Sequence, residues 1–308
     1  MSSTRSHSLA FLLVTLTFGA SAAAQPPADS LDVRVQAEIS QSQGKVSLFA
    51  KNLDTGMTYG FGADDLVRTA STIKVPIMVE AFAQVKAGRT RWTRRVVLTD
   101  RKKISGSGVL QELSGGLQLR LRDAMTLMIV LSDNTATNLV LDVIGTEAVN
   151  SRMDRLGLTQ TRVLRKVGGG GVSKAGRDPA NARFGLGVTT PREMVTLLEK
   201  LERGEVVSRA ASAEMIKILK RQQSHEGIGR TLRGVEMATK PGALDQLRSD
   251  VGIIYTKSGR IAMAISCDEL PEVNWTVDNP GYALLSRLSL VLIEGLASSD
   301  GLPLPPAK

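Results

Sequence analysis

A serine and a lysine stand three positions apart at the start of an apolar run, in the stretch TASTIKVPIM (residues 69–78). At the start of a helix, Ser71 and Lys74 would lie one turn apart on the same face, so the amine could reach the hydroxyl. The helix N-terminus favours a developing oxyanion and lowers the lysine pKa. A neutral lysine can accept the serine proton, so the pair could form an activated nucleophile. The spacing alone is not specific, because Ser42 and Lys45 repeat it.

Few other side chains could supply a base or bind a metal. The chain has two histidines, His7 and His225, and one cysteine, Cys267. His7 falls in a segment that we expect to be removed, and two remaining residues without motif spacing do not make a zinc site. Cys267 ends the apolar run RIAMAISC and is expected to be a buried thiol. If the chain is a hydrolase, we therefore expect no metal and no cofactor, and a lysine or a carboxylate as base.

Two further motifs follow along the chain. In LSDNTATN, Ser132, Asp133 and Asn134 stand between two expected helices, where all three residue types are also preferred as helix caps. In ATKPGA, Lys240 precedes Pro241 at the edge of an expected strand. By itself, Lys-Pro-Gly indicates only a turn.

The expected elements place these motifs on one α/β (α+β) fold. Residues 45–53 alternate and lead through the turn DTG into a hairpin, while segments 235–242, 249–256 and 260–267 indicate three more strands. Helices are expected at residues 73–85, 121–131 and 133–144, from Pro191 onward, and from about residue 280 to 296. The glycine-rich stretch 166–187 between them is long for a loop in a compact domain, which is typical of a functional or mobile segment. Strands at both ends predict an antiparallel sheet built from both chain ends, with an all-helical lobe inserted at about 75–231.

Taken together, S-x-x-K, S-D-N and K-x-G in this order resemble the active-site set of class A β-lactamases, within the penicillin-recognising serine hydrolases. Ser71 precedes Ser132 by 61 residues, and Ser132 precedes Lys240 by 108. The resemblance also covers the order of strands and helices across nearly all of residues 25–300, which we expect to be one catalytic domain.

The resemblance implies a role for each matching residue. Ser71 would attack the lactam carbonyl, and Lys74 would accept or relay its proton. Ser132 would pass a proton to the leaving nitrogen, Asn134 would hold the substrate's side-chain amide, and Lys240 would favour a substrate carboxylate.

The oxyanion hole implied by the resemblance would use the backbone N–H groups of Ser71 and Ala243, with Gly242 letting the strand approach. In the third motif, Pro241 replaces the hydroxyl residue that family members place between Lys and Gly. Substrate binding is therefore expected to differ, although the Ala243 N–H remains available.

A second departure concerns deacylation. Class A enzymes carry in the long loop a glutamate, followed shortly by an asparagine, that activates the deacylating water. The nearest analogue here is RDPAN, with Asp178 before Pro179 and Asn181 three residues on. Asp178 is either a shorter deacylation base or the partner of a loop arginine. If the base is lost, deacylation slows by ~10²- to 10⁴-fold, so an acyl-enzyme could persist.

The N-terminus resembles a secretory signal. Arg5 is followed by an apolar stretch from Leu9 to about Phe18 and by small residues ending at Ala24. We expect residues 1–24 to be removed near Ala24, which predicts a secreted or periplasmic protein. No cysteine near this cut offers a lipid attachment point, so no stable membrane anchor is expected, and the tail 301–308 is expected to be disordered.

Composition limits the class of partner. The net charge is +9, and the densest basic stretch is RTRWTRR (residues 89–95). It contains a single tryptophan on which a base could stack, so it does not indicate nucleic-acid binding. We expect a monomer that acts on a small molecule. Three functions stay open: a β-lactam hydrolase, a cell-wall D-Ala-D-Ala peptidase or other acyl-serine hydrolase, and a slowly deacylating binder of β-lactams or muropeptides.

Overall fold

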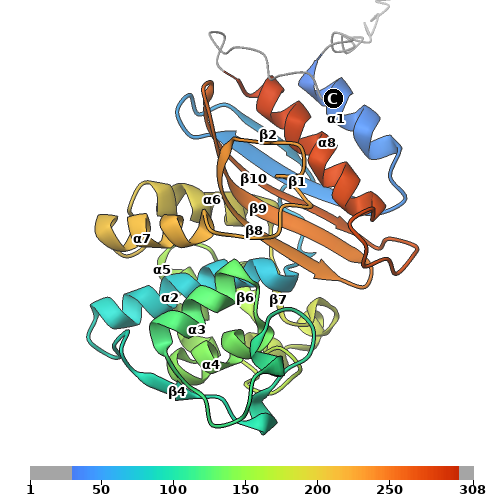
Figure 1. Ribbon diagram of the computed structural model, residues 1–308. Coiled ribbons are helices and arrows are strands. Elements are labelled where there is room, and N and C mark those ends of the chain that lie inside the picture. Colours follow the sequence, from blue (N-terminus) through green and yellow to red (C-terminus); the bar gives the residue numbers. More distant parts are fainter. Residues whose placement is uncertain (1–29, 298–308) are drawn as a thin grey trace, which may run out of the picture.

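The computed structural model describes residues 30–297, and its centre is a five-stranded antiparallel sheet (Figure 1). The strand order is β2-β1-β10-β9-β8, so the first and last strands of the chain lie side by side. The sheet strands are β1 (Lys45–Asn52), β2 (Thr58–Phe61), β8 (Glu236–Leu244), β9 (Leu247–Thr256) and β10 (Gly259–Asp268). This arrangement confirms the expected α/β fold with a sheet built from both chain ends. The expected signal segment 1–24 and tail 301–308 lie outside the described residues.

Both faces of the sheet are covered, and this explains the nearly continuous burial of β9. On the outer face, α1 (Leu31–Ser40) lies beside α8 (Pro280–Gly295), and together they bury an apolar layer that includes Ile254, Met263 and Leu288 (Figure 1). Cys267 belongs to this layer and is buried, as its place in an apolar run predicts.

The inner face of the sheet packs on the helical part of the chain. Its helices are α2 (Lys74–Lys86), α3 (Leu121–Val130), α4 (Asn134–Ile144), α5 (Thr146–Arg155), α6 (Pro191–Glu202) and α7 (Arg209–Leu219). Short strands join them: β3 (Val67–Arg68), β6 (Arg162–Val163) and β7 (Gly187–Thr189) form one sheet, and β4 (Arg95–Val97) pairs with β5 (Gln118–Arg120). The helix α2 is buried from Lys74 to Gln84 because the other helices and the sheet surround it.

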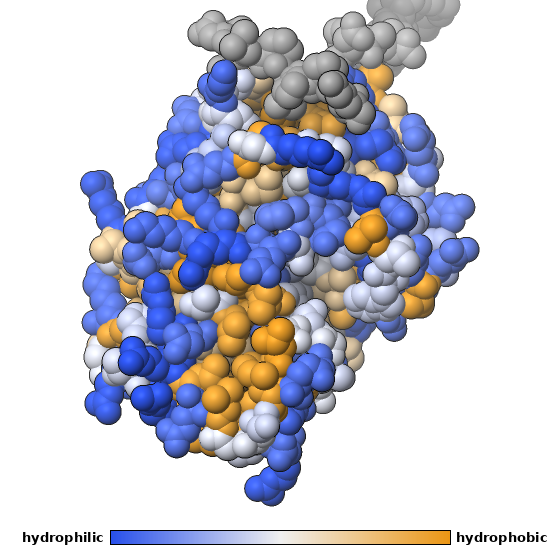
Figure 2. Space-filling view, viewed as in Figure 1, coloured by the Kyte–Doolittle hydropathy of each residue, from blue (hydrophilic) through white to orange (hydrophobic). Residues whose placement is uncertain are grey.

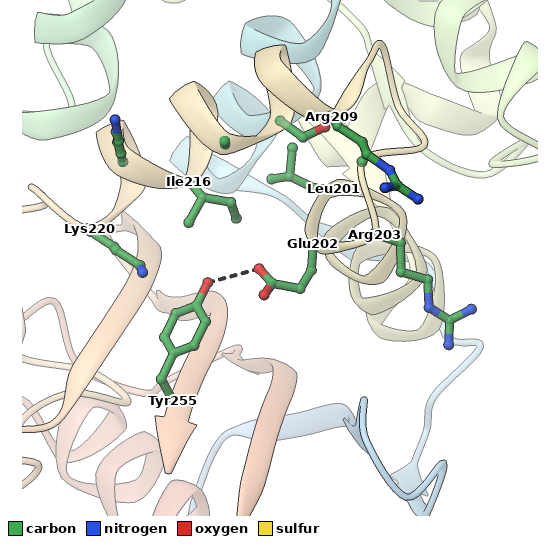
Figure 3. Close-up of a pocket in the computed structure, with 11 residues that line it drawn as sticks. Leu201, Glu202, Arg203, Arg209, Ile216, Lys220 and Tyr255 are labelled. Atoms are coloured by element: carbon green, nitrogen blue, oxygen red, sulfur yellow. Dashed lines mark hydrogen bonds between the residues drawn. The ribbon is translucent and has the colours of Figure 1, made fainter.

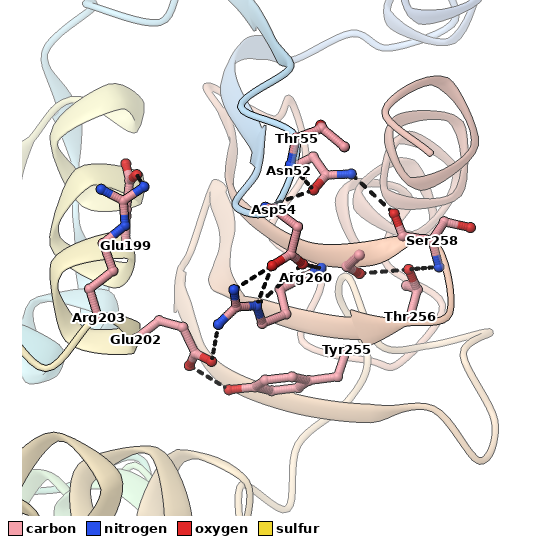
Figure 4. Close-up of polar contacts among 11 residues, drawn as sticks. Asn52, Asp54, Thr55, Glu199, Glu202, Arg203, Tyr255, Thr256, Ser258 and Arg260 are labelled. Carbon is pink, nitrogen blue, oxygen red and sulfur yellow. Dashed lines mark hydrogen bonds and ion pairs between the residues drawn. The ribbon is translucent and has the colours of Figure 1, made fainter. Parts of the chain in front are cut away.

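A polar network fixes α6 against the strands (Figure 4). Arg260 of β10 binds Asp54 in the turn after β1 and also Glu202 of α6, and the Tyr255 hydroxyl donates to Glu202 at 2.9 Å. The side-chain amide of Asn52 donates to the Ser258 carbonyl at 3.2 Å, which joins the two hairpin turns. The contacts of Glu202 with Arg260 and Tyr255 tie α6 to β9 and β10 of the sheet.

On the face that Figure 2 shows, most of the surface is polar, and apolar side chains gather in one area over the helical part. Within residues 30–297, no helix has both the length and the apolar character that crossing a membrane requires.

Candidate active site

Ser71 lies on a single turn of 3-10 helix (Ala70–Ile73) that continues directly into α2. Its side chain lines a cleft of about 740 Å³ between the helical part and the edge strand β8. The preceding residue, Ala70, has φ of 45°, a conformation that is costly for a residue other than glycine. This unusual backbone sets the entry of the chain into the helix, so the N-terminal end of α2 meets the cleft at Ser71.

Lys74 is completely buried, and its amine faces the S-D-N segment. The Lys74 Nζ donates to the Ser132 carbonyl at 2.6 Å, to the Ser132 Oγ at 3.1 Å and to the Asn134 Oδ1 at 3.1 Å. Burial lowers the pKa of Lys74 well below its usual value, the Lys240 ammonium lowers it further, and the Asp133 carboxylate opposes both effects. The environment therefore makes the neutral amine that a general base requires easier to reach than in a free lysine.

In the S-D-N segment, Asp133 caps a helix, whereas Ser132 and Asn134 face Lys74. Asp133 is the N-cap of α4, with its Oδ1 accepting from the Ala136 N–H at 2.7 Å and its Oδ2 from two more backbone N–H groups. Ser132 has φ of 54°, and this turn directs both Ser132 and Asn134 toward Lys74. The capping interpretation thus holds for Asp133, whereas its two neighbours belong to the cleft.

Lys240 completes the group from the sheet side. Its fully buried amine donates to the Ser132 Oγ at 3.0 Å and to the Pro241 carbonyl at 2.7 Å. Burial lowers the pKa of Lys240 to about 7, and the Asp250 carboxylate acts in the opposite direction. The Ser132 hydroxyl oxygen therefore accepts hydrogen bonds from two amines, which leaves its proton free to donate into the cleft.

The edge strand β8 approaches the start of α2 very closely at Gly242. A Cβ at this position would lie 2.9 Å from the Thr69 carbonyl oxygen and 3.0 Å from the Ser71 nitrogen, so only glycine fits. Pro241 has no N–H and is tolerated on an edge strand where that group would point away from its partner, here β9. Ala243, two residues on, has the same orientation and lines the cleft, so its N–H points toward the same space as Ser71.

Asp178 does not join these residues. Its side chain is exposed, its Oδ1 accepts from the Ala180 N–H at 3.0 Å, and it is not among the residues that line the cleft. Nor does Asp178 pair with a loop arginine within residues 30–297. The shorter side chain caps its own 3-10 turn (Pro179–Phe184) and the loop path carries it outward, contrary to the expectation of a base near Ser71.

The loop instead presents cations to the cleft. Arg165 and Lys166 lie where the chain enters the loop, Arg183 lies where the chain approaches its end, and all three line the cleft. Among the described residues, no aspartate or glutamate lines the cleft. Sequence reasoning missed both arginines because no local pattern marks them. It also missed Asp250, which is buried opposite Pro241 in the β8–β9 register and whose pKa burial raises to about 7.

A second cavity, of about 540 Å³, lies between α6, α7 and the end of β9 (Figure 3). The Glu202–Tyr255 hydrogen bond crosses it, and Lys220 lies over the Tyr255 ring at 4.1 Å. None of the predicted site residues lines this cavity. Within residues 30–297, no group of three or more histidine, cysteine, aspartate or glutamate side chains is placed to hold a metal ion.

Comparison with known proteins agrees with this geometry. The family model described as the β-lactamase enzyme family matches residues 30–296. The β-lactamase L2 of Stenotrophomonas maltophilia is 24% identical over 264 residues, which cover 82% of this chain and 82% of that protein.

Two solved structures extend the comparison. A β-lactamase from Sphaerobacter thermophilus is 29% identical, with a TM-score of 0.75 over 88% of this chain and 98% of that one. A PBP-A variant solved as an acyl-enzyme complex with penicillin G is 25% identical, with a TM-score of 0.74 over 88% and 98% of the two chains. With the family model matched over nearly all of the described residues, the chain belongs to the β-lactamase enzyme family.

Proposed function

We propose that this protein is a serine hydrolase of the class A type that opens β-lactam rings through an acyl-enzyme on Ser71. One observation carries the proposal: the Ser132 hydroxyl is held between the amines of Lys74 and Lys240, beside Ser71 in the same cleft. This arrangement supports proton transfer between a serine nucleophile and a leaving nitrogen, which is what lactam opening requires.

Acylation would proceed through three proton transfers. The Ser71 Oγ attacks the lactam carbonyl carbon while its proton passes to the Lys74 Nζ. As the carbon–nitrogen bond breaks, the ring nitrogen takes the Ser132 proton, and Ser132 regains one from Lys74, 3.1 Å away. The backbone N–H groups of Ser71 and Ala243 would stabilise the oxyanion.

The substrate would lie across the cleft between the two lobes. Lys240, whose buried amine lies behind Ser132 on the sheet side, would attract through its positive charge the carboxylate that penicillins carry beside the ring nitrogen. Asn134 on the helical side would bind the side-chain amide; its Oδ1 accepts from Lys74, and its Nδ2 donates to the Ser105 carbonyl at 3.0 Å.

Deacylation is expected to be slow. Among the described residues no carboxylate lines the cleft, so a water molecule beside the acyl group would lack the general base that class A enzymes use. Loss of such a base costs ~10²- to 10⁴-fold in rate. This observation also favours a second candidate, a cell-wall D-Ala-D-Ala peptidase or a binder that retains its acyl group. The similarity to a PBP-A variant captured as an acyl-enzyme with penicillin G supports the same alternative.

Turnover of a chromogenic cephalosporin by the purified protein distinguishes the candidates. A lactamase hydrolyses many equivalents, and Ser71→Ala abolishes the activity. A single stoichiometric burst followed by no further hydrolysis would instead favour the retained acyl-enzyme. Release of D-alanine from a D-Ala-D-Ala peptide, with no steady cephalosporin turnover, would favour the peptidase.

We also propose that the protein is exported and acts as a monomer. The signal-like residues 1–24 support export, with cleavage near Ala24. N-terminal sequencing of the protein from a periplasmic fraction tests the cleavage, and a mass of one chain by light scattering tests the monomer.

A further inference from the structure

Two arginines at the cleft have no carboxylate partner. Among the four cations on the lining of the cleft, Arg68 pairs with Asp268 and Lys166 pairs with Asp142, whereas Arg165 and Arg183 form no ion pair within residues 30–297. Clustered cations that no acidic side chain balances favour an anion at that place.

Both arginines line the same cleft and contact one short segment, residues 184–185. The Arg183 guanidinium carbon is 4.7 Å from the centre of the Phe184 ring, and an Arg165 Nη2 lies 3.8 Å from the Cβ position of Gly185. The loop stems that carry them are joined by a hydrogen bond from the Leu164 N–H to the Leu186 carbonyl at 2.9 Å. Both arginines are therefore on backbone fixed beside the cleft, and not at the tip of the loop.

The position of Arg165 and Arg183 relative to a bound substrate follows from the attachment of the loop to α4. The side chain of Asn138 on α4 exchanges two hydrogen bonds with the backbone of Val167, which fixes the loop stem over the helix that begins at Asn134. Lys240 lies on the opposite lobe, on β8. A substrate with its ring carboxylate near Lys240 and its side-chain amide at Asn134 would extend the rest of its acyl side chain along the part of the cleft that Arg165 and Arg183 line.

We propose that Arg165 and Arg183 form a second anion subsite, which selects substrates that carry a carboxylate on the acyl side chain in addition to the one at Lys240. The proposal rests on the proposed function, because it uses the same substrate orientation. The substrate that this subsite would select is an acyl donor with two negative charges, either a β-lactam or an acyl-D-Ala-D-Ala peptide.

The test compares donors that differ by one carboxylate. Benzylpenicillin and carbenicillin, its α-carboxy derivative, are mixed with the full chain, and the second-order rate of acylation is followed by intact-protein mass. We expect the parent to prefer carbenicillin, because a hydrogen bond to a charged group contributes roughly tenfold in rate. Arg165→Gln with Arg183→Gln should lower the carbenicillin rate about tenfold more than the benzylpenicillin rate, and 0.5 M salt should weaken the parent's preference.

Arg91→Gln is the matched control, since Arg91 is exposed and lies away from the cleft lining. It should leave the ratio of the two rates unchanged. A second arm compares acetyl- and succinyl-capped Lys-D-Ala-D-Ala by D-alanine release; a preference confined to this arm assigns the subsite to peptides. Equal rates within both pairs, or a ratio that the double variant does not alter, would overturn the subsite. Absence of any adduct, of any penicillin hydrolysis and of any D-alanine release would instead overturn the proposed function.

Discussion

Removal of the Ser132 hydroxyl should slow acylation while leaving the fold in place. In the structure the Ser132 Oγ accepts from the Lys74 amine at 3.1 Å and from the Lys240 amine at 3.0 Å. In Ser132→Ala each amine loses one acceptor but keeps another: Lys74 retains the Ser132 carbonyl and Asn134, and Lys240 retains the Pro241 carbonyl. We therefore expect a stability loss of only about 1 to 3 kcal/mol.

The kinetic effect should be larger, because the leaving nitrogen loses its proton donor. General acid catalysis contributes ~10²- to 10⁴-fold, which corresponds to roughly 3 to 5.5 kcal/mol of barrier. The assay is the rate of Ser71 acylation by benzylpenicillin, measured by intact-protein mass against time, with thermal unfolding measured on the same samples.

Ser224→Ala is the matched control, because Ser224 also lines the cleft. It should acylate within about twofold of the parent rate. If Ser132→Ala acylates as fast as the parent, the proposed relay through Ser132 is wrong.

Three further predictions follow from single contacts. Gly242→Ala should reduce acylation by ~10²-fold or more, because the new Cβ would lie 3.0 Å from the Ser71 nitrogen and push apart the two N–H groups of the oxyanion hole; an unchanged rate would contradict that geometry. Asp178→Asn should leave the lifetime of the acyl-enzyme within about twofold of the parent value, because Asp178 is exposed and caps only its own turn; a lifetime longer by ~10²-fold would restore Asp178 as the base. Asp250→Asn should flatten the dependence of Tm on pH between about 4 and 7. Burial raises the pKa of Asp250 to about 7, so the folded parent retains a proton that the unfolded chain releases above pH about 4. The parent therefore loses stability as the pH rises through this range. If the Tm of the parent instead rises between pH 4 and 7, and Asp250→Asn removes that rise, the raised pKa of Asp250 is wrong.

The fold could be predicted because its elements have strong local patterns. The alternation in residues 45–52 and the apolar strands near the C-terminus mark a sheet with both faces covered, and the structure pairs Lys45 with Asp268 across the two chain ends. The long apolar run after Pro280 likewise marks α8, which covers the outer face.

The site could be predicted only in part. The types and order of Ser71, Lys74, Ser132 and Lys240 were enough to expect one site. The structure joins both lysines to Ser132 by hydrogen bonds, and Ser132 and Ser71 line the same cleft. The sequence could not show that Asp133 alone takes the capping role, because Ser, Asp and Asn are all good caps and the choice depends on the φ of Ser132.

The positions of the loop side chains depend on the path of the backbone between residues 165 and 187, which local sequence does not determine. RDPAN predicts a carboxylate near the cleft only if the chain turns inward there, and in the structure Asp178 is exposed and lies outside the cleft lining. The same path brings Arg165 and Arg183, which are 18 positions apart, to the lining of one cleft. Contacts of this kind follow from tertiary structure and leave no periodic signal.

The most direct test of the central claim is the site of covalent attachment. The full chain is mixed with benzylpenicillin and digested with trypsin, which cleaves after Arg68 and Lys74 and so isolates the peptide TASTIK around the proposed nucleophile. We predict that the intact protein gains the mass of one penicillin molecule, that this mass lies on Ser71 within that peptide, and that Ser71→Ala gains none. An adduct on any other residue, or an unmodified parent that also leaves the excess penicillin unhydrolysed, would contradict the proposed role of Ser71.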